Sequence, residues 1–176
     1  TGETTEGVGG IFYKVGDYYP DPKVDLTNDT EKAKIQGIVF WVDPSDSRHG
    51  KVVGLHENSS VQWADNNNWS VLTGVNDMSN GLVNMLTMSE FISSESKSWS
   101  NFPAFEWVHN MNGSDEDYSN SNAMGVWYLP AYNELWSSDS SSLYEAFTAI
   151  GATAFNDKLT AAGGTALYNT DWSPSW

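Results

Sequence analysis

The pattern of apolar positions changes near residue 81. Before that point, short runs of β-branched and aromatic residues are separated by clusters of turn-forming residues, which is typical of short strands. Residues 37–42 and 51–55 flank the turn-rich segment 43–50, and this arrangement predicts an antiparallel hairpin with a long loop. Further short strands are predicted at residues 11–15, 61–63 and 125–129, whereas residues 18–22 are too rich in proline for regular structure.

After residue 81, apolar residues recur at helical spacing. The second of these helices is predicted to begin after Asn101, a residue type that caps helices, with Pro103 in the first turn; another begins near Pro130. Gly163-Gly164 ends the last helix. The predicted apolar faces are Leu82, Met85, Leu86 and Ile92; Ala104, Trp107, Val108 and Met111; Leu143, Ala146, Phe147 and Ile150; and Phe155, Leu159 and Ala162.

Length and composition predict one soluble domain exposed outside the cell. The 176 residues, 39% of them hydrophobic, suffice for one core. No apolar run approaches the roughly 18 residues of a membrane span, so no membrane insertion is expected from this segment. The polar opening at residues 1–7 implies that any signal peptide has been removed or lies outside the sequence. Nine Trp, eight Tyr and seven Phe beside only eight Lys plus Arg favour an extracellular or outer-membrane-surface location.

Charge and cysteine content exclude several classes of function. A formal net charge of −15 would repel phosphate backbones, so nucleic acid is excluded as a partner. The chain has no cysteine, which excludes disulfides, thiolate nucleophiles, zinc-thiolate sites and iron–sulfur clusters.

One stretch of the sequence resembles a family signature. Residues 125–136 resemble the Trp-Tyr-Leu-Pro-x-x-x-Glu-Leu motif of bacterial C-type-lectin-like surface domains, which are common in gut Bacteroidetes. The stretch reads Gly125-Val126-Trp127-Tyr128-Leu129-Pro130-Ala131-Tyr132-Asn133-Glu134-Leu135-Trp136. The predicted hairpin and the ending Asp171-Trp172-Ser173-Pro174-Ser175-Trp176, similar to a Trp-Ser motif of that family, follow the same order.

The resemblance implies a C-type-lectin-like α+β fold with short mixed or antiparallel strands and several packed helices. It covers residues 35–176 and leaves residues 1–34 as an N-terminal strand and irregular lead-in. Because family members normally continue past the Trp-Ser motif, the domain is expected to be truncated at its C-terminal end, with part of the binding face missing. In the signature, scaffold roles are expected for Trp127, Pro130 and Glu134.

Few patterns in the chain point to catalysis or metal binding. The sequence contains no Gly-x-Ser-x-Gly, Walker-type or His-Glu-x-x-His motif, and formylglycine-generating enzymes, which share the broad fold, depend on cysteine. The three histidines are too scattered for a metal triad. The carboxylates of residues 115–117 and of Asp43 and Asp46 offer oxygen ligands, yet neither group has EF-hand spacing. We therefore predict no cofactor, no metal and no catalytic residue.

The aromatic residues supply the candidate ligand surface. Trp107, Trp127 and Phe147 are predicted core residues, whereas six tryptophans lie beside polar loop residues: Trp63, Trp69, Trp99, Trp136, Trp172 and Trp176. Flat rings beside Asn and Asp suit sugar rings and protein contacts alike, with core packing as the competing interpretation. The predicted ligand-binding residues are Trp136, Asn169, Asp171, Trp172 and Trp176.

These patterns favour a non-catalytic extracellular ligand-binding or adhesion module that recognises a glycan or a cell-surface protein. Two alternatives stay open: a carbohydrate-active hydrolase domain or its accessory, and a structural subunit of a fimbrial or pilus tip. A receptor diversified by a retroelement is a further possibility within the first class. The sequence sets neither the ligand nor the oligomeric state.

Overall fold

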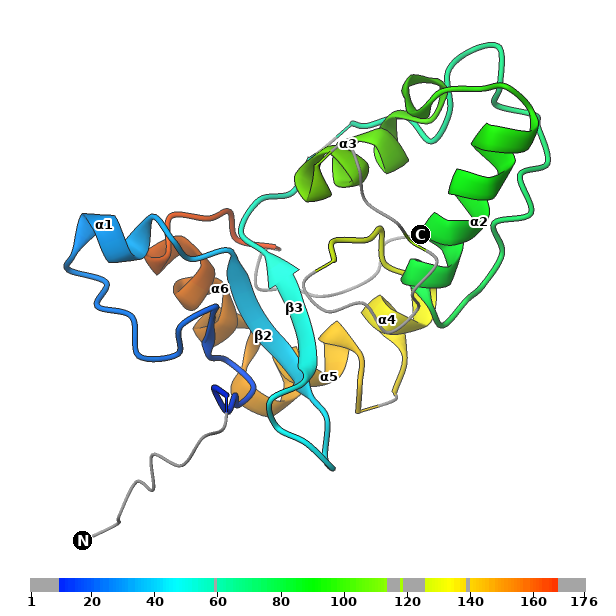
Figure 1. The fold of residues 1–176 in the computed structure, drawn as a ribbon. Coiled ribbons are helices and arrows are strands. Elements are labelled where there is room, and N and C mark those ends of the chain that lie inside the picture. The colour runs from blue at the N-terminus through cyan, green and yellow to red at the C-terminus, as the bar shows by residue number, and fades with distance from the viewer. Residues whose placement is uncertain (1–9, 59, 114–117, 119–125, 139, 168–176) are drawn as a thin grey trace, which may run out of the picture. The chain divides into compact units, whose positions relative to one another are not determined.

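The computed structural model describes residues 10–58, 60–113, 118, 126–138 and 140–167 (Figure 1). It has a mixed α+β fold with a small three-stranded antiparallel sheet and several helices, which confirms the predicted class. Two compact units account for it: Thr1–Glu57 together with Ser138–Trp176, and Asn58–Ser137. The predicted division into residues 1–34 and 35–176 stays a prediction.

The sheet of the first unit has the order β1-β2-β3, with β1 at Tyr18–Tyr19, β2 at Gly37–Val42 and β3 at Gly50–Gly54. β2 pairs antiparallel with β3, and a register shift lies between Val39 and Trp41. The predicted hairpin is therefore confirmed. Asp43 and Asp46 order its loop by accepting hydrogen bonds from the backbone N–H groups of Ser45 and Arg48.

Two local predictions for the first unit are wrong. Residues 11–15 form no strand, and the strand lies instead at Tyr18–Tyr19, inside the proline-rich segment expected to be irregular. β1 forms because Tyr18 pairs with Ile38 of β2, a tertiary contact that local composition does not reveal. The short helix α1, Asp29–Lys32, is capped by the side chain of Asn28 and buries no residue, so it has no apolar period to recognise.

Helices α5, Leu143–Ile150, and α6, Ala152–Ala161, pack against β2 (Figure 1). Phe147 and Phe155 meet with ring centroids 4.9 Å apart. The predicted faces of both helices are buried except at Ile150, which is only partly buried. Gly163, with φ of 90°, follows the end of α6 as predicted, because a residue with a side chain is strained in that conformation.

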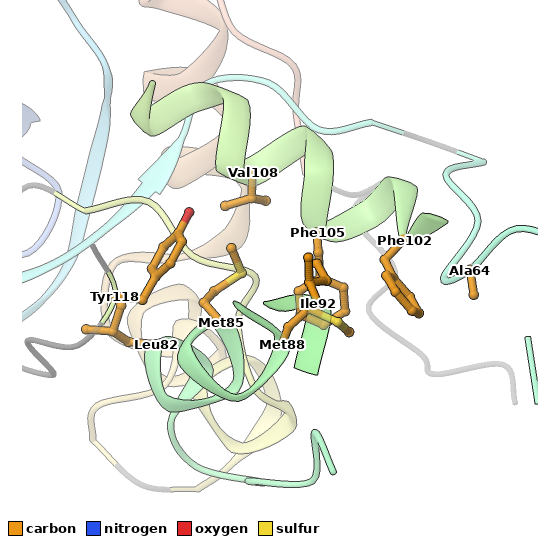
Figure 2. Close-up of a cluster of buried hydrophobic side chains, with 9 residues drawn as sticks. All are labelled: Ala64, Leu82, Met85, Met88, Ile92, Phe102, Phe105, Val108 and Tyr118. Atoms are coloured by element: carbon orange, nitrogen blue, oxygen red, sulfur yellow. The ribbon is translucent and has the colours of Figure 1, made fainter. Parts of the chain in front are cut away.

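The second unit contains helix α2, Gly81–Ser94, the 3₁₀ helix η1, Trp99–Asn101, and helices α3, Pro103–Asn112, and α4, Tyr132–Trp136. Figure 2 shows Leu82, Met85, Met88 and Ile92 of α2 on the side of that helix that faces α3 and its N-cap residue. Its core also contains Ala64, Phe102, Phe105, Val108 and Tyr118. The predicted α2 face is confirmed, with Leu86 at its partly buried edge.

The predicted start and face of α3 need correction. Phe102 is the N-cap residue and Asn101 ends η1, although Pro103 does occupy the first turn. The buried α3 residues are Phe105, Val108 and His109; Ala104 and Trp107 are partly buried and Met111 is exposed. The bulky rings of Phe102 and Phe105 fill the core beside α2 and so set the rotation of α3.

Two predicted strands in this unit are absent. Residues 61–63 and 126–129 have no sheet partner, and Gly125 lies outside the described residues. The backbone of Trp127 is held by the Asn112 side chain, which accepts from its N–H at 2.6 Å and donates to its C=O at 2.7 Å. Trp127 is partly buried at the edge of the core and is not a fully buried core residue. No helix in the described part of the chain has the length and apolar character to cross a membrane.

Candidate functional site

The structure places only one of the predicted ligand-binding residues. Trp136 is the last residue of α4 and is partly buried. Asn169, Asp171, Trp172 and Trp176 lie outside the described residues. The structure therefore does not show whether the five predicted residues lie close together. Other aromatic residues of the described chain are exposed and form the candidate site.

The segment 61–79 of the second unit exposes several large apolar side chains, and we call it the tryptophan loop. Trp69 is 73% exposed and Leu72 is 94% exposed, while Trp63 and Met78 are less open to solvent. Single exposed apolar residues are ordinary on protein surfaces, but their concentration in one loop is a feature of interaction sites. Trp69 is the candidate contact residue, since an open indole ring offers the largest flat surface.

Asp65 anchors the first half of the tryptophan loop. Its carboxylate accepts hydrogen bonds from the Asn67 N–H at 2.9 Å, the Asn68 side chain at 2.8 Å and the Asn101 side chain at 2.9 Å. The Asp65 N–H also donates to the Asn101 C=O at 2.9 Å. The bonds from Asn101 and Asn68 favour the ionised carboxyl and lower the pKa of Asp65 from its usual 3.8. The loop is thus tied to η1.

Apolar packing also holds the first half of the tryptophan loop against the core of the unit. Ala64 is buried in the core, and the Trp63 ring meets Phe105 edge to face with centroids 4.8 Å apart. Asn68 is also buried; its N–H donates to the Asp65 C=O, and its C=O accepts from Val71. The Asn68 Oδ1 atom has no hydrogen-bond partner within the described structure. Trp69 therefore follows directly on a buried, fixed residue.

The second half of the loop is tied to α2. The Asn84 side chain accepts from the Asp77 N–H at 2.9 Å and donates to the Asp77 C=O at 2.7 Å. The Asp77 carboxylate accepts from the N–H groups of Ser79 and Asn80, and Asn80 caps α2. Both ends of the loop are therefore fixed to helical elements, and Trp69 and Leu72 lie between the anchors.

Glu134 forms a second polar centre, which is buried. Its carboxylate accepts from the Gly81 N–H at 2.9 Å, the Ala131 N–H at 3.0 Å and the Tyr128 hydroxyl at 2.9 Å. Burial, together with the Glu134 charge, raises the pKa of Tyr128 above its usual range, so the phenol stays protonated and donates. This arrangement joins the first turns of α2 and α4, which agrees with the scaffold role expected for Glu134.

A third cluster surrounds His109. The His109 ring stacks on Trp99 with centroids 4.3 Å apart, and its Nδ1 lies 3.1 Å from the Tyr118 hydroxyl. Trp99, one of the tryptophans predicted beside polar residues, is thus partly buried and packs against the core. His109 and Tyr118 are both buried, so this cluster has a packing role. No group of three or more potential metal ligands occurs among the described residues, and the acidic segment 115–117 lies outside them.

The tryptophan loop lies in a strongly acidic part of the chain. No lysine or arginine occurs between Lys51 and Lys97. Lys97 is the only Lys or Arg of the Asn58–Ser137 sequence, which contains nine carboxylates: Asp65, Asp77, Glu90, Glu95, Glu106, Asp115, Glu116, Asp117 and Glu134. Its formal net charge is therefore −8. An anionic ligand would be repelled from such a surface.

Trp69 was outside the predicted ligand set, although a signal for it exists in the sequence. The run Asn66-Asn67-Asn68 before it predicts a polar loop, and all four residues that precede this tryptophan, positions 65–68, are polar. The hydrogen bonds that hold Asp65 and Asn68 just before it are visible only in the structure. Comparison of the chain with models of protein families, with curated proteins and with solved structures finds no match.

Proposed function

We propose that this chain is a non-catalytic ligand-binding or adhesion module that acts outside the cell or on its outer surface, with the tryptophan loop as a ligand contact. The observation that carries the proposal is the exposure of Trp69, 73%, on a loop whose inner residues are buried. An exposed indole leaves a large apolar surface in water, and covering that surface with a ligand is favourable.

The anchoring of the loop supports the same function. Binding is weakened when a flexible segment must be ordered, because the lost conformational freedom opposes association. Here the hydrogen bonds of Asp65 and Asn84 hold both halves of the loop before any ligand arrives. Trp69 is therefore presented by a pre-organised surface, and most of the contact free energy remains for the ligand.

A C-type-lectin-like fold is part of the proposal. Its support is the chain order of the β2–β3 hairpin, the helices α2 and α3, the Trp-Tyr-Leu-Pro segment at residues 127–130 and the helix that follows it. The buried Glu134 of the same motif has a structural role, because its carboxylate accepts hydrogen bonds from the backbone of Gly81 and Ala131. Ligand contacts at Trp136, Asn169, Asp171, Trp172 and Trp176 stay predictions within this proposal.

Cell binding tests the proposal. The fluorescently labelled chain is incubated with panels of bacterial and animal cells, and bound label is measured by flow cytometry. We expect saturable binding to at least one cell type, weakened about 30-fold by Trp69→Ala, since buried interface tryptophans contribute roughly 2 kcal/mol or more. Phe12→Ala is the matched control, because Phe12 is also an aromatic residue, 64% exposed, but belongs to the first unit.

Circular dichroism and a thermal melt establish that both variants are folded. Saturable binding that Trp69→Ala leaves unchanged would remove the tryptophan loop from the ligand contact. Absence of binding to every cell type would contradict the adhesion function, and release of reducing sugars from a glycan panel would replace it with hydrolysis.

A further inference from the structure

We infer that the ligand of the tryptophan loop is an uncharged glycan, with a pyranose ring stacked on Trp69 and its hydroxyl groups bound by neighbouring amides. The inference rests on the proposed ligand-binding function, which leaves the ligand open between a glycan and a protein. It depends on three properties of the loop: one open ring, exposed amides beside it, and the absence of positive charge.

Trp69 suits the apolar face of a sugar. One or both faces of a pyranose carry several C–H groups whose hydrogens have partial positive charge, and the π face of an indole has partial negative charge. Stacking requires a face of the indole to be free, which its 73% exposure provides. Trp63 offers less free ring surface for stacking, because its ring packs against Phe105 and is less exposed.

Asn66 and Asn67 suit the rim of the same sugar. Both are exposed and lie three and two residues before Trp69, respectively. A primary amide offers two donors and an acceptor, which matches hydroxyl groups that both donate and accept. The Asp65 carboxylate fixes the backbone of Asn67 through its N–H, so the amide side chains start from a defined position. The exposed polar side chains just before Trp69 are therefore neutral amides.

Charge distinguishes neutral from acidic glycans. Uronic acids, sulfate esters and sialic acids are bound in proteins by Lys or Arg, and none occurs between Lys51 and Lys97. The Asn58–Ser137 sequence has a net charge of −8 from nine carboxylates and Lys97, which opposes the approach of a polyanion. Trp69 is the most exposed aromatic ring of the loop, and the exposed amides of Asn66 and Asn67 precede it in the sequence. An aromatic ring beside amides differs from the contiguous apolar centre of a protein interface, so a glycan is favoured over a protein.

Affinity electrophoresis of the full chain tests the inference. Native gels contain either neutral polysaccharides (β-glucan, mannan, galactan) or acidic ones (polygalacturonate, hyaluronan, heparin), and dissociation constants follow from the retardation. We expect at least one neutral polysaccharide to retard the chain and no acidic one to do so. Trp69→Ala should weaken that binding about tenfold or more, the double substitution Asn66→Ala with Asn67→Ala several-fold, and Phe12→Ala not at all. Trp69→Tyr should retain part of the affinity, because it keeps an aromatic face.

Three outcomes would overturn the inference: no retardation by any neutral polysaccharide, retardation only by acidic ones, or neutral binding that Trp69→Ala leaves unchanged. Cells treated with periodate or with protease distinguish failure of the glycan inference from failure of the proposed binding function. If Trp69-dependent cell binding survives periodate oxidation of the cell glycans but is lost after protease treatment, the ligand is a protein; the glycan inference is then wrong and the binding function stands. If the chain binds neither cells nor polysaccharides, both fail.

Discussion

Glu134 shows how a charged group is accommodated in a core of this kind. A buried carboxylate is unfavourable unless hydrogen bonds replace its hydration. Here two backbone N–H groups and the Tyr128 hydroxyl do so, and the two backbone donors belong to the starts of different helices. Backbone N–H groups at helix starts have no partner within their own helix. One side chain thus satisfies two such groups and neutralises part of the local dipole.

Replacing Glu134 with Gln should lower the free energy of unfolding by about 1 to 2 kcal/mol. The amide keeps the shape but loses the charge, and charge-assisted hydrogen bonds are about twice as strong as neutral ones. Urea denaturation measures the change. Glu90→Gln is the control, since Glu90 is exposed on α2 and should change stability by less than about 0.5 kcal/mol. Equal effects of the two substitutions would show that Glu134 has no special structural role.

The Asp65 carboxylate likewise holds the tryptophan loop in place through hydrogen bonds. Its folded-state pKa lies below the usual 3.8, with the Asn101 hydrogen bond as the largest cause. A depressed carboxyl pKa contributes stability that is present above the unfolded value and is lost as the pH falls through the folded value. Anchoring of the loop should therefore persist at neutral and mildly acidic pH and be lost only in strong acid.

Asn101→Ala should raise the pKa of Asp65 toward its usual value. The substitution removes the side-chain donor, whereas the bonds from Asn67 and Asn68 remain. The Asp65 carboxyl carbon signal, followed by NMR against pH, gives the midpoint directly. Asn76→Ala, an exposed residue of the same loop, should leave the midpoint unchanged. A midpoint that is the same in wild type and Asn101→Ala would contradict the anchoring described for the loop.

At the scale of single elements, α2 organises the core of the second unit. Its residues Met85 and Met88 are fully buried in the cluster of Figure 2, which also contains Phe105 and Val108 of α3. The chain provides a natural comparison, because Met78 precedes the same helix but is 55% exposed. The same residue type thus occurs in the core and on the surface a few positions apart.

Met88→Ala should destabilise the protein by about 2 to 5 kcal/mol, whereas Met78→Ala should cost less than about 0.5 kcal/mol. The difference arises because truncation in the core removes buried contacts and leaves a cavity, while truncation at the surface does neither. Chemical denaturation of both variants under identical conditions checks the prediction. Similar free energies for the two would mean that α2 does not occupy the core as described.

Elements with a strong period could be predicted from the sequence, and those made by tertiary contacts could not. The β2–β3 hairpin and the faces of α2, α5 and α6 follow from apolar spacing. β1 exists only because β2 lies beside it, and residues 126–129 stay out of a sheet where the Asn112 side chain binds the backbone of Trp127. Neither contact has a local signature.

For the whole molecule, the order of segments along the chain has a physical consequence. The second unit is one continuous segment, Asn58–Ser137, whereas the first is formed by the segments before and after it. All nine residues of the cluster in Figure 2 come from that continuous segment. Length and composition predict one core for the whole chain, whereas apolar periodicity identifies the apolar faces but not which faces meet. The tryptophan loop belongs to this unit, and its polar character, though not its anchoring, could be predicted.

Because its core and its anchors lie within one stretch, the segment 58–137 should fold when produced alone. Segments of this length bury enough surface to be stable, although marginally, so we expect a cooperative thermal transition and helical circular dichroism. Met88→Ala should abolish or strongly lower the transition, and Met78→Ala should not. Added salt should raise the melting temperature, since it screens the repulsion within a segment of net charge −8. A non-cooperative melt with strong binding of a hydrophobic dye would contradict this prediction and show that the segment needs the rest of the chain to fold.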